Sequence, residues 1–428
     1  MHPQGARDEG ADRYRGMGLA EFYRSTRQRT MDLVKPLSAE DCQVQSMPDV
    51  SPTKWHLAHT TWFFETFILE TSLADFQPYH PRYRVLFNSY YNSVGEQHAR
   101  PQRGLLSRPP LEDIFRYRAH VDDLMEKLFA DRRDAGFARL VEIGLNHEEQ
   151  HQELLLMDIK HVLATNPLRP PYREDLAVSK QDTDRVEWIH FDEKVGEIGH
   201  DGAGFCFDNE LPRHRSLIGR HALANRCVTS GEYLDFMADG GYARPELWLS
   251  EGWDWRQRGS IKAPLYWERD GSDWAETTLG GLRAVDEAAP VVHVSYFEAE
   301  AFARWAKARL PREEEWEAAS SAAESGAAND LQRDHLHPIA ALARPGRLAQ
   351  MLGDVWEWTQ SSYAPYPGYR APDGAIGEYN GKFMCNQYVL RGGSCVTPRG
   401  HTRESYRNFF PVHSRWAFSG IRLARDLA

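Results

Sequence analysis

Cysteine is scarce in this sequence, and its few copies lie far apart. The 428 residues include five cysteines, which are Cys42, Cys206, Cys227, Cys385 and Cys395. No two of them form a CxxC pair, and an odd number cannot all pair within one chain. We therefore expect neither a disulfide framework nor a structural zinc site built from cysteines.

Long apolar runs and long basic runs are also missing. No uninterrupted apolar stretch approaches the roughly 18 residues that cross a bilayer, and the first sixteen residues are polar where a signal peptide would be apolar. The formal net charge of −11 argues against nucleic acid or an anionic membrane as the main partner. These absences predict a soluble, cytoplasmic protein and leave its oligomeric state open.

The chain is longer than the roughly 250–300 residues at which a single core stops growing, so two domains are expected. Residues 1–18 are predicted to be disordered, and 19–165 carry helical periodicity. Residues 166–186 contain three prolines and mixed charge, which is typical of a linker. Residues 187–428 hold short β-like runs between loops rich in glycine and tryptophan, with no internal repeat. The expected fold class is α+β, with an N-terminal four-helix bundle and a C-terminal domain that is largely irregular.

Four segments before the linker have helical patterns. The first runs from Leu19 to about Leu37, and Ser51-Pro52 is a start signal for the second, with serine as N-cap. The third and fourth are expected at about 111–130 and 134–165. In the second half, we expect strands in VEWIHF, PVVHVSY and YVLRGGS and one helix at about 297–308.

Two histidines in the fourth predicted helix form the most informative motif. His147 and His151 are four residues apart, so both imidazoles project from one face of the helix. Such a pair suits a metal, although histidines at this spacing are also common in cores and on surfaces. The same letters match HExxH, in which Glu148 would be the general base of a zinc protease.

A third ligand is expected on the second helix. His56 and His59 are three residues apart and share a face, and the small Ala58 favours His59. The alternative is that both histidines line an aromatic core. Three imidazoles suit zinc, iron and copper alike, so the ligands do not choose the metal.

The segments WHLAHTTWFFE and LNHEEQHQE resemble the DinB-type four-helix bundle. The second half resembles the formylglycine-generating-enzyme (sulfatase-modifying) fold, which is α+β and C-type-lectin-like. The segments that carry this resemblance are 227–237, 290–319, 353–359, 390–395 and 418–425. Together the two halves resemble the ergothioneine-biosynthesis sulfoxide synthases, which are non-haem iron enzymes.

This resemblance implies an iron(II)-dependent oxygenase. Such an enzyme uses dioxygen to join Nα-trimethylhistidine (hercynine) to cysteine or γ-glutamylcysteine, giving a sulfoxide. The implied iron ligands are His59, His147 and His151, and His56 lies outside this set. The implied partners are small molecules.

The resemblance also implies residues for the substrates. Gln150 matches a position that hydrogen-bonds the substrate imidazole, and Tyr90 or Tyr91 matches a catalytic phenol near the oxygen site. Arg100 and Arg103 match arginines that bind the carboxylate of the sulfur donor.

Two aromatic residues near the C-terminus are implied as well. Trp416 and Phe418 match positions around the trimethylammonium group. We expect Arg422, in the same segment, to be structural.

Several differences between this sequence and related enzyme families reduce the number of possible activities. No cysteine follows Cys395, so the oxidation of protein cysteine by formylglycine-generating enzymes is not expected. Ovothiol synthases carry an additional methyltransferase domain, and this sequence has no GxG-type nucleotide-binding unit. A selenosugar donor, which would make the product selenoneine, stays open. A zinc hydrolase using HExxH and a non-enzymatic metal- or thiol-binding module remain alternatives from other classes.

Overall fold

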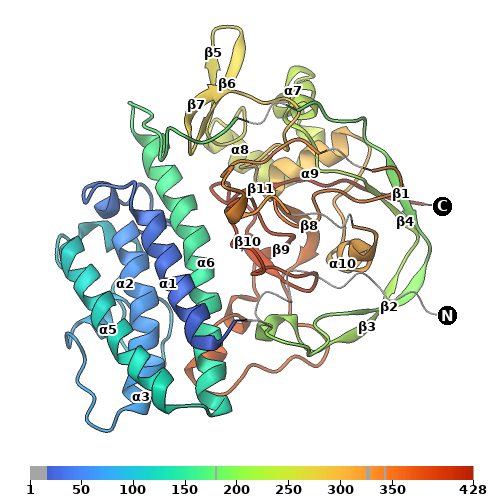
Figure 1. The fold of residues 1–428 in the computed structure, drawn as a ribbon. Helices are drawn as coiled ribbons and strands as arrows, with labels where there is room; N and C mark the ends of the chain where they lie inside the picture. The colour runs from blue at the N-terminus through green and yellow to red at the C-terminus, as the bar shows by residue number, and fades with distance from the viewer. Residues whose placement is uncertain (1–16, 179–180, 324–327, 342–343, 428) are drawn as a thin grey trace. The chain divides into compact units, whose positions relative to one another are not determined.

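The computed structural model describes residues 17–178, 181–323, 328–341 and 344–427 (Figure 1). The chain divides into two compact units. The helical unit contains residues 17–173 together with Pro372–Tyr379, and the mixed unit contains the described parts of Glu174–Ala371 and Asn380–Ala428. The predicted disordered segment 1–18 falls outside the described residues except for its last two.

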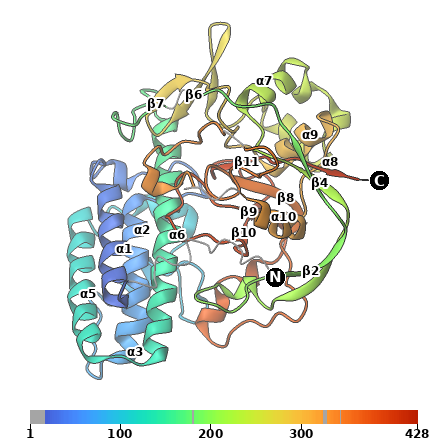
Figure 2. The same cartoon turned by 45° about the vertical axis from the view of Figure 1, so that its right-hand side comes forward.

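Four long helices build the helical unit, and they run side by side in Figures 1 and 2. They are α1 (Leu19–Val34), α2 (Thr53–Phe64), α5 (Leu111–Asp131) and α6 (Ala135–Thr165). Helix α2 packs against α5 and α6, and α1 packs against α6. Shorter helical pieces are α3 (Glu70–Ser72), α4 (Tyr83–Leu86) and a 3₁₀ segment at Arg100–Leu105. The predicted four-helix bundle is confirmed.

Helix α2 is the central helix of this unit. All twelve of its residues are buried, although six of them are polar or charged. A π-helical turn at Glu65–Leu69 follows it and leads into α3. The predicted N-cap at Ser51 was wrong by one residue, because Pro52 holds that position without a side-chain cap. The Ser51 hydroxyl instead accepts a hydrogen bond from Arg103 Nη1 at 2.9 Å.

Helix α6 begins where the sequence predicted. Asp134 is its N-cap, and its carboxylate accepts a hydrogen bond from the Phe137 N–H at 2.9 Å. The helix continues for 31 residues. Histidines 147 and 151 therefore lie well inside a regular helix, where four residues make slightly more than one turn.

The mixed unit contains small sheets and short helices. The order β1-β4-β12 forms one sheet, β10-β9-β8-β11 another, β5-β6-β7 a third, and β2 pairs with β3. The strands are β1 (Trp188–Phe191), β2 (Lys194–Ile198), β3 (His214–Ile218), β4 (His221–Ala224), β5 (Trp267–Asp270), β6 (Asp273–Thr278), β7 (Gly281–Ala284), β8 (Trp356–Ser362), β9 (Gln387–Arg391), β10 (Asn408–Pro411), β11 (Ser419–Gly420) and β12 (Ala424–Asp426). The helices are α7 (Ser230–Ala238), α8 (Ser250–Arg258), α9 (Tyr296–Trp305) and α10 (Glu313–Ala319). The α+β class is confirmed.

One predicted strand is absent. The segment 290–296 is buried but forms no strand, because His293 has a left-handed backbone with φ of 65°. Its backbone groups bond to separate neighbours: the Val291 N–H donates to the Val228 carbonyl, and the His293 carbonyl accepts from Leu265. Hydrophobic residues alone could not distinguish this buried irregular segment from a strand.

Arg422 forms a buried ion pair with Glu357 inside the mixed unit. Its guanidinium donates to both oxygens of Glu357 at 2.7 Å and to the carbonyls of Ala224 and Ala349, and both charged side chains are fully buried. Trp316 Nε1 also donates to Glu357. Arg422 is therefore a structural residue of the mixed unit.

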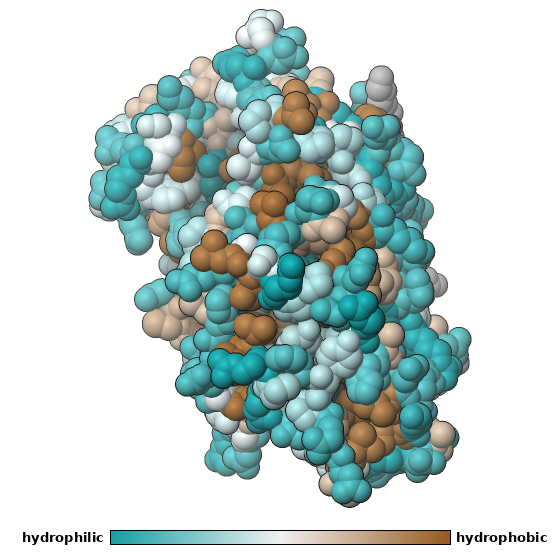
Figure 3. Space-filling model, turned by 90° about the vertical axis from the view of Figure 1, so that its left-hand side faces the viewer, coloured by the Kyte–Doolittle hydropathy of each residue, from teal (hydrophilic) through white to brown (hydrophobic). Residues whose placement is uncertain are grey.

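The surface shows no extended apolar region on the face drawn in Figure 3, where apolar side chains form separate patches among hydrophilic ones. Across the part of the chain that the structure describes, no helix combines the length and apolarity that a membrane span requires.

Asp354 makes the stability of the mixed unit depend on pH. Burial raises the pKa of this carboxyl from 3.8 to about 6, although hydrogen bonds from Ile339 and Asn329 oppose the shift. A raised carboxyl pKa destabilises the folded state above pH 6, and the penalty is relieved as pH falls toward 3.8. Relative to Asp354→Asn, the wild type should therefore gain about 1 kcal/mol between pH 7 and pH 5. Chemical denaturation at both pH values measures this, and parallel pH profiles for the two proteins would contradict it.

Candidate metal centre

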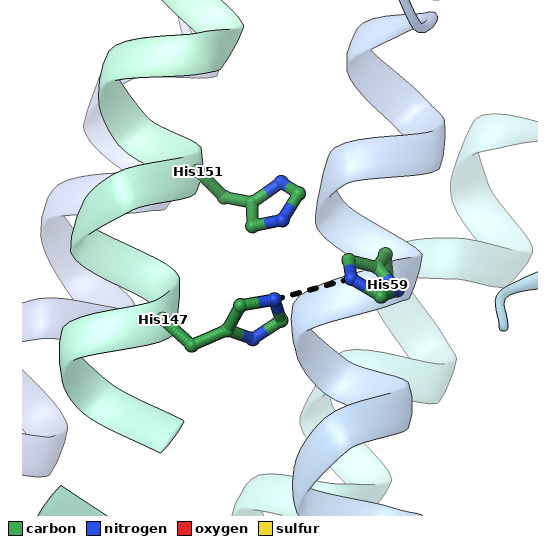
Figure 4. A group of neighbouring side chains, drawn as sticks. All are labelled: His59, His147 and His151. Carbon is green, nitrogen blue, oxygen red and sulfur yellow. Dashed lines mark hydrogen bonds between the residues drawn. The ribbon is translucent and has the colours of Figure 1, made fainter. Parts of the chain in front are cut away.

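Three histidines of the helical unit converge at one point. His59 projects from α2, and His147 and His151 project from α6 (Figure 4). One ring nitrogen from each lies within 4.8 Å of the others, and His59 Nε2 is 3.1 Å from His147 Nε2. Within the described ranges, this is the one group of three or more His, Cys, Asp or Glu side chains arranged to hold a metal ion.

The three imidazoles are neutral at ordinary pH. Burial lowers the pKa of His147 to about 3 and lowers the pKa of His59 and His151 well below the usual value. For His59 and His151, the nearby His147 lowers it further. Neutral imidazole is the form that binds a metal.

The ring of His59 is held in a defined orientation. Its Nδ1–H donates to the Phe87 carbonyl at 2.6 Å, which leaves the lone pair on Nε2. Trp55 and Trp62 stack near-parallel with the ring, at centroid distances of 4.5 Å and 5.6 Å. Because 55, 59 and 62 have helical spacing, α2 itself provides both aromatic neighbours.

These features fit a metal ion. The lone pair of His59 Nε2 faces His147 Nε2, and a cation between the two would be bound by both. His147 Nδ1 is buried and has no hydrogen-bond partner in the described structure. The donor set is three neutral nitrogens, which suits a divalent transition metal.

Glu148 has a different role from that in the HExxH hypothesis. Its carboxylate is fully buried and accepts hydrogen bonds from Thr30 at 2.6 Å, from Arg27 at 2.9 Å and from Arg118. Although burial opposes ionisation, the two arginines lower the pKa of Glu148 to about 2. A carboxylate so strongly stabilised as the anion is a poor general base, so a zinc hydrolase is not favoured.

A segment from the second half of the chain completes the helical unit. Glu378 accepts hydrogen bonds from the Asn92 and Ser93 backbone N–H groups at 2.9 and 2.8 Å. The next residue, Tyr379, donates its hydroxyl hydrogen to Gln150 Oε1, and its ring centroid is 5.7 Å from that of His147. The structure thus places the phenol of Tyr379 beside the histidines, and this tyrosine was not predicted from the sequence.

The two predicted tyrosines lie in different surroundings. Tyr91 is fully buried and packs against Trp62 and Phe67, so its ring belongs to the core. Tyr90 is partly exposed, stacks on Tyr91, and lies with its ring centroid 6.4 Å from that of Tyr379. Trp62 connects this aromatic group to the His59 ring.

The two predicted arginines also differ. Arg100 is exposed and donates to the Asp49 carbonyl. The guanidinium of Arg103 is buried, lies 3.4 Å from the Trp55 ring centroid, and has an Nε without a hydrogen-bond partner in the described structure. Burial is the main cause that lowers the pKa of Arg103 well below its usual value, and the positive charge of nearby Arg100 lowers it further. Such a cation favours an anionic ligand.

Relatives of known identity match almost the whole chain. Hercynine oxygenase of Mycolicibacterium smegmatis is 32% identical to it, over 96% of this chain and 99% of the relative. The chain belongs to the hercynine oxygenase family. The corresponding protein of Mycobacterium tuberculosis is 31% identical over 96% of this chain and 99% of its own length.

Two family models match the two halves of this hercynine oxygenase family member. The DinB superfamily matches residues 23–162, and the sulfatase-modifying factor enzyme 1-like domain matches 194–344 and 328–427. The structure of PvdO from Pseudomonas aeruginosa aligns with 58% of this chain and 100% of its own, with 17% identity and a TM-score of 0.38. The family resemblance and the class of enzyme, an oxygenase, are confirmed.

Trp416 and Phe418 belong to the mixed unit. Phe418 is fully buried and packs against His293 at a centroid distance of 4.7 Å. Trp416 keeps 8% of its surface exposed and contacts Phe410. Their role near the trimethylammonium group stays a prediction.

Two features of this metal centre were not predicted from the sequence. Tyr379 is 229 residues from Gln150, so no local pattern could connect the two. His56 is buried behind His151 and hydrogen-bonds to it, although the resemblance placed it outside the ligand set. The spacing of Asp158, seven residues after His151, was the available signal, because it puts the carboxylate on the same helix face.

Proposed function

We propose that this protein is an iron(II)-dependent hercynine oxygenase. It would use dioxygen to form a carbon–sulfur bond between hercynine and cysteine or γ-glutamylcysteine, giving a sulfoxide. The observation that carries the proposal is the convergence of three neutral imidazoles beside Gln150, two of them buried and His151 partly exposed, in a chain of this family. The cytoplasm is the expected location, and the expected partners are small molecules.

His59, His147 and His151 would hold the iron. Bound iron(II) supplies exchangeable coordination positions at which dioxygen and a thiolate can react. His59 and His147 are buried, and His151 is partly exposed, so a substrate could approach the centre on the side of His151.

Gln150 would bind the hercynine imidazole, and Tyr379 would donate a proton. Gln150 precedes His151 directly, so its amide lies at the edge of the ligand face of α6. The Tyr379 hydroxyl that donates to this amide is a second polar group at the same place. Tyr379 and the neighbouring Tyr90 are therefore the candidate proton donors, whereas the core position of Tyr91 suits a packing role.

Arg103 would bind the carboxylate of the sulfur donor. Replacing Arg103 with methionine should raise the KM for the donor about tenfold to a hundredfold, since a charged hydrogen bond contributes about 1.5–3 kcal/mol. Metal affinity should not fall, because the charge of Arg103 disfavours a positive charge at His59 and His151, and its removal relieves that repulsion. Steady-state kinetics with each substrate varied in turn measure this, with Arg108→Met as an exposed control. An equal rise in KM for hercynine and donor would contradict the assignment.

The test of the proposed function is anaerobic reconstitution with iron(II), followed by dioxygen uptake and product mass. Hercynine is supplied with cysteine, γ-glutamylcysteine or a selenosugar in separate reactions. Uptake that requires both substrates and gives their coupled sulfoxide supports the proposal and identifies the donor. A coupled product from the selenosugar alone would assign selenoneine synthesis instead. No uptake with any pair would overturn the oxygenase proposal.

A further inference from the structure

His56 connects a metal-facing histidine to a buried carboxylate. It lies on α2, and its Nδ1 is 2.8 Å from His151 Nδ1, while its Nε2 is 3.0 Å from Asp158 Oδ2. His56 and Asp158 are each only 3% exposed. The three side chains therefore form a chain of hydrogen bonds from α6 to α2 and back to α6, buried at His56 and Asp158 and partly exposed at His151.

The direction of each hydrogen bond follows from the chemistry of the groups. A carboxylate oxygen accepts, so His56 carries its hydrogen on Nε2 and donates it to Asp158. When Nε2 holds the one ring hydrogen of His56, its Nδ1 atom is an acceptor. The hydrogen between the two Nδ1 atoms therefore belongs to His151, which leaves the lone pair of His151 on Nε2.

The carboxylate at the end of this chain is itself fixed. Asp158 Oδ2 also accepts the backbone N–H of Ser51 at 2.8 Å, two residues before α2 begins. This bond ties Asp158 to the same helix that carries His56 and His59. The hydrogen-bond chain thus sets the ring of His151 relative to α2.

The three ligands differ in how they are oriented. His59 uses the same arrangement as His151, with Nδ1–H donating and Nε2 bare, but its acceptor is the Phe87 carbonyl. His147 Nδ1 has no partner within the described residues. His56 thus accepts the Nδ1–H of His151, as the Phe87 carbonyl accepts the Nδ1–H of His59.

We propose that His56 and Asp158 are positioning residues that hold His151 in the tautomer whose Nε2 lone pair faces the metal. This inference rests on the metal centre of the proposed function and extends it to two residues outside the ligand set. Groups that orient metal-binding histidines in this way typically change metal affinity by about 10- to 100-fold when removed.

The first test is the tautomer itself, in the metal-free protein. Long-range ¹H–¹⁵N correlation spectra of histidine-labelled protein, assigned with single histidine variants, should show hydrogen on Nδ1 of His151 and on Nε2 of His56. A His56 with hydrogen on Nδ1 would overturn the inference. This readout depends on neither turnover nor metal loading.

The second test is the affinity for Co²⁺, a spectroscopic substitute for iron(II). His56→Leu removes the acceptor and should weaken binding about 10- to 100-fold. His56→Asn places an amide oxygen near the position of Nδ1 and should restore most of the affinity. In the Co²⁺-loaded wild type, a shifted exchangeable proton signal from His151 Nδ1–H is expected, and it should be lost in His56→Leu.

A matched control comes from the same helix. His161 is a partly buried histidine of α6 whose Nδ1 bonds to Ser46 Oγ at 2.6 Å. His161→Leu should leave Co²⁺ affinity unchanged. Equal affinity in wild type and His56→Leu would overturn the inference while leaving the proposed function intact. Weakened binding in His56→Leu, with no turnover by the wild type, would support the inference and remove the proposed function.

Discussion

Replacing His59 with alanine is expected to weaken metal binding about a thousandfold and to abolish turnover. Structural zinc sites with four protein ligands bind with about 10–16 kcal/mol, or about 2.5–4 kcal/mol per ligand, and each ligand of a three-histidine centre should contribute at the upper end of this range. Each 1.4 kcal/mol is a factor of ten. The loss should exceed that of other changes in the centre, because the ring of His59 is held by Phe87 and by two tryptophans. A ligand fixed in advance binds without a further entropic cost.

Calorimetric titration with Co²⁺ and anaerobic iron(II) assays measure this effect. His120, an exposed histidine of α5, provides the control, and His120→Ala should bind metal like the wild type. The unfolding temperature of both variants shows whether the fold is retained. A folded His59→Ala protein with wild-type metal affinity would remove His59 from the ligand set.

The sequence predicted what depends on local spacing. The four-residue interval between His147 and His151 places both on one helix face, and the predicted start at about residue 134 agrees with the observed N-cap at Asp134. The convergence of His59, His147 and His151 was predicted because LAH and HxxxH are short segments on regular helices, and the resemblance to the DinB-type bundle selected His59 over His56. The same locality explains why the four long helices were predicted to within about three residues at most of their ends.

The remaining features depend on contacts between distant segments. Tyr379 reaches the centre from a segment of irregular structure that no periodicity marks. The role of Glu148 was open in the sequence because a glutamate between two histidines suits either a general base or an ion pair. Its partners, Arg27 and Arg118, come from α1 and α5 and were not identifiable before these helices were packed together.

Replacing Glu148 with glutamine is expected to destabilise the helical unit by about 3–5 kcal/mol, since removing one partner leaves buried charge uncompensated. Arg27 and Arg118 are at most 4% exposed, and a neutral amide cannot balance two guanidinium groups. The unfolding temperature should fall by roughly 10 °C. Differential scanning calorimetry measures this, with Glu126→Gln as the control. The Arg24–Glu126 pair also joins α1 to α5, but it is exposed, so its loss should cost less than about 1 kcal/mol.

The same variant separates an ion-pair role from a catalytic one. If Glu148 stabilises the fold through its ion pairs, adding Arg118→Met to Glu148→Gln should recover part of the lost stability. The second change removes one of the two buried cations, and the other, Arg27, keeps its ion pair with Asp122 at 2.7 Å. Below its unfolding temperature, Glu148→Gln should bind metal and turn over within a few-fold of the wild type, because the glutamate faces the arginines. A general base would give the opposite pattern, with a stable fold and a rate reduced by a factor of about 10²–10⁴. That result would return the HExxH hypothesis to consideration, since the buried carboxylate would then have to reach the metal centre.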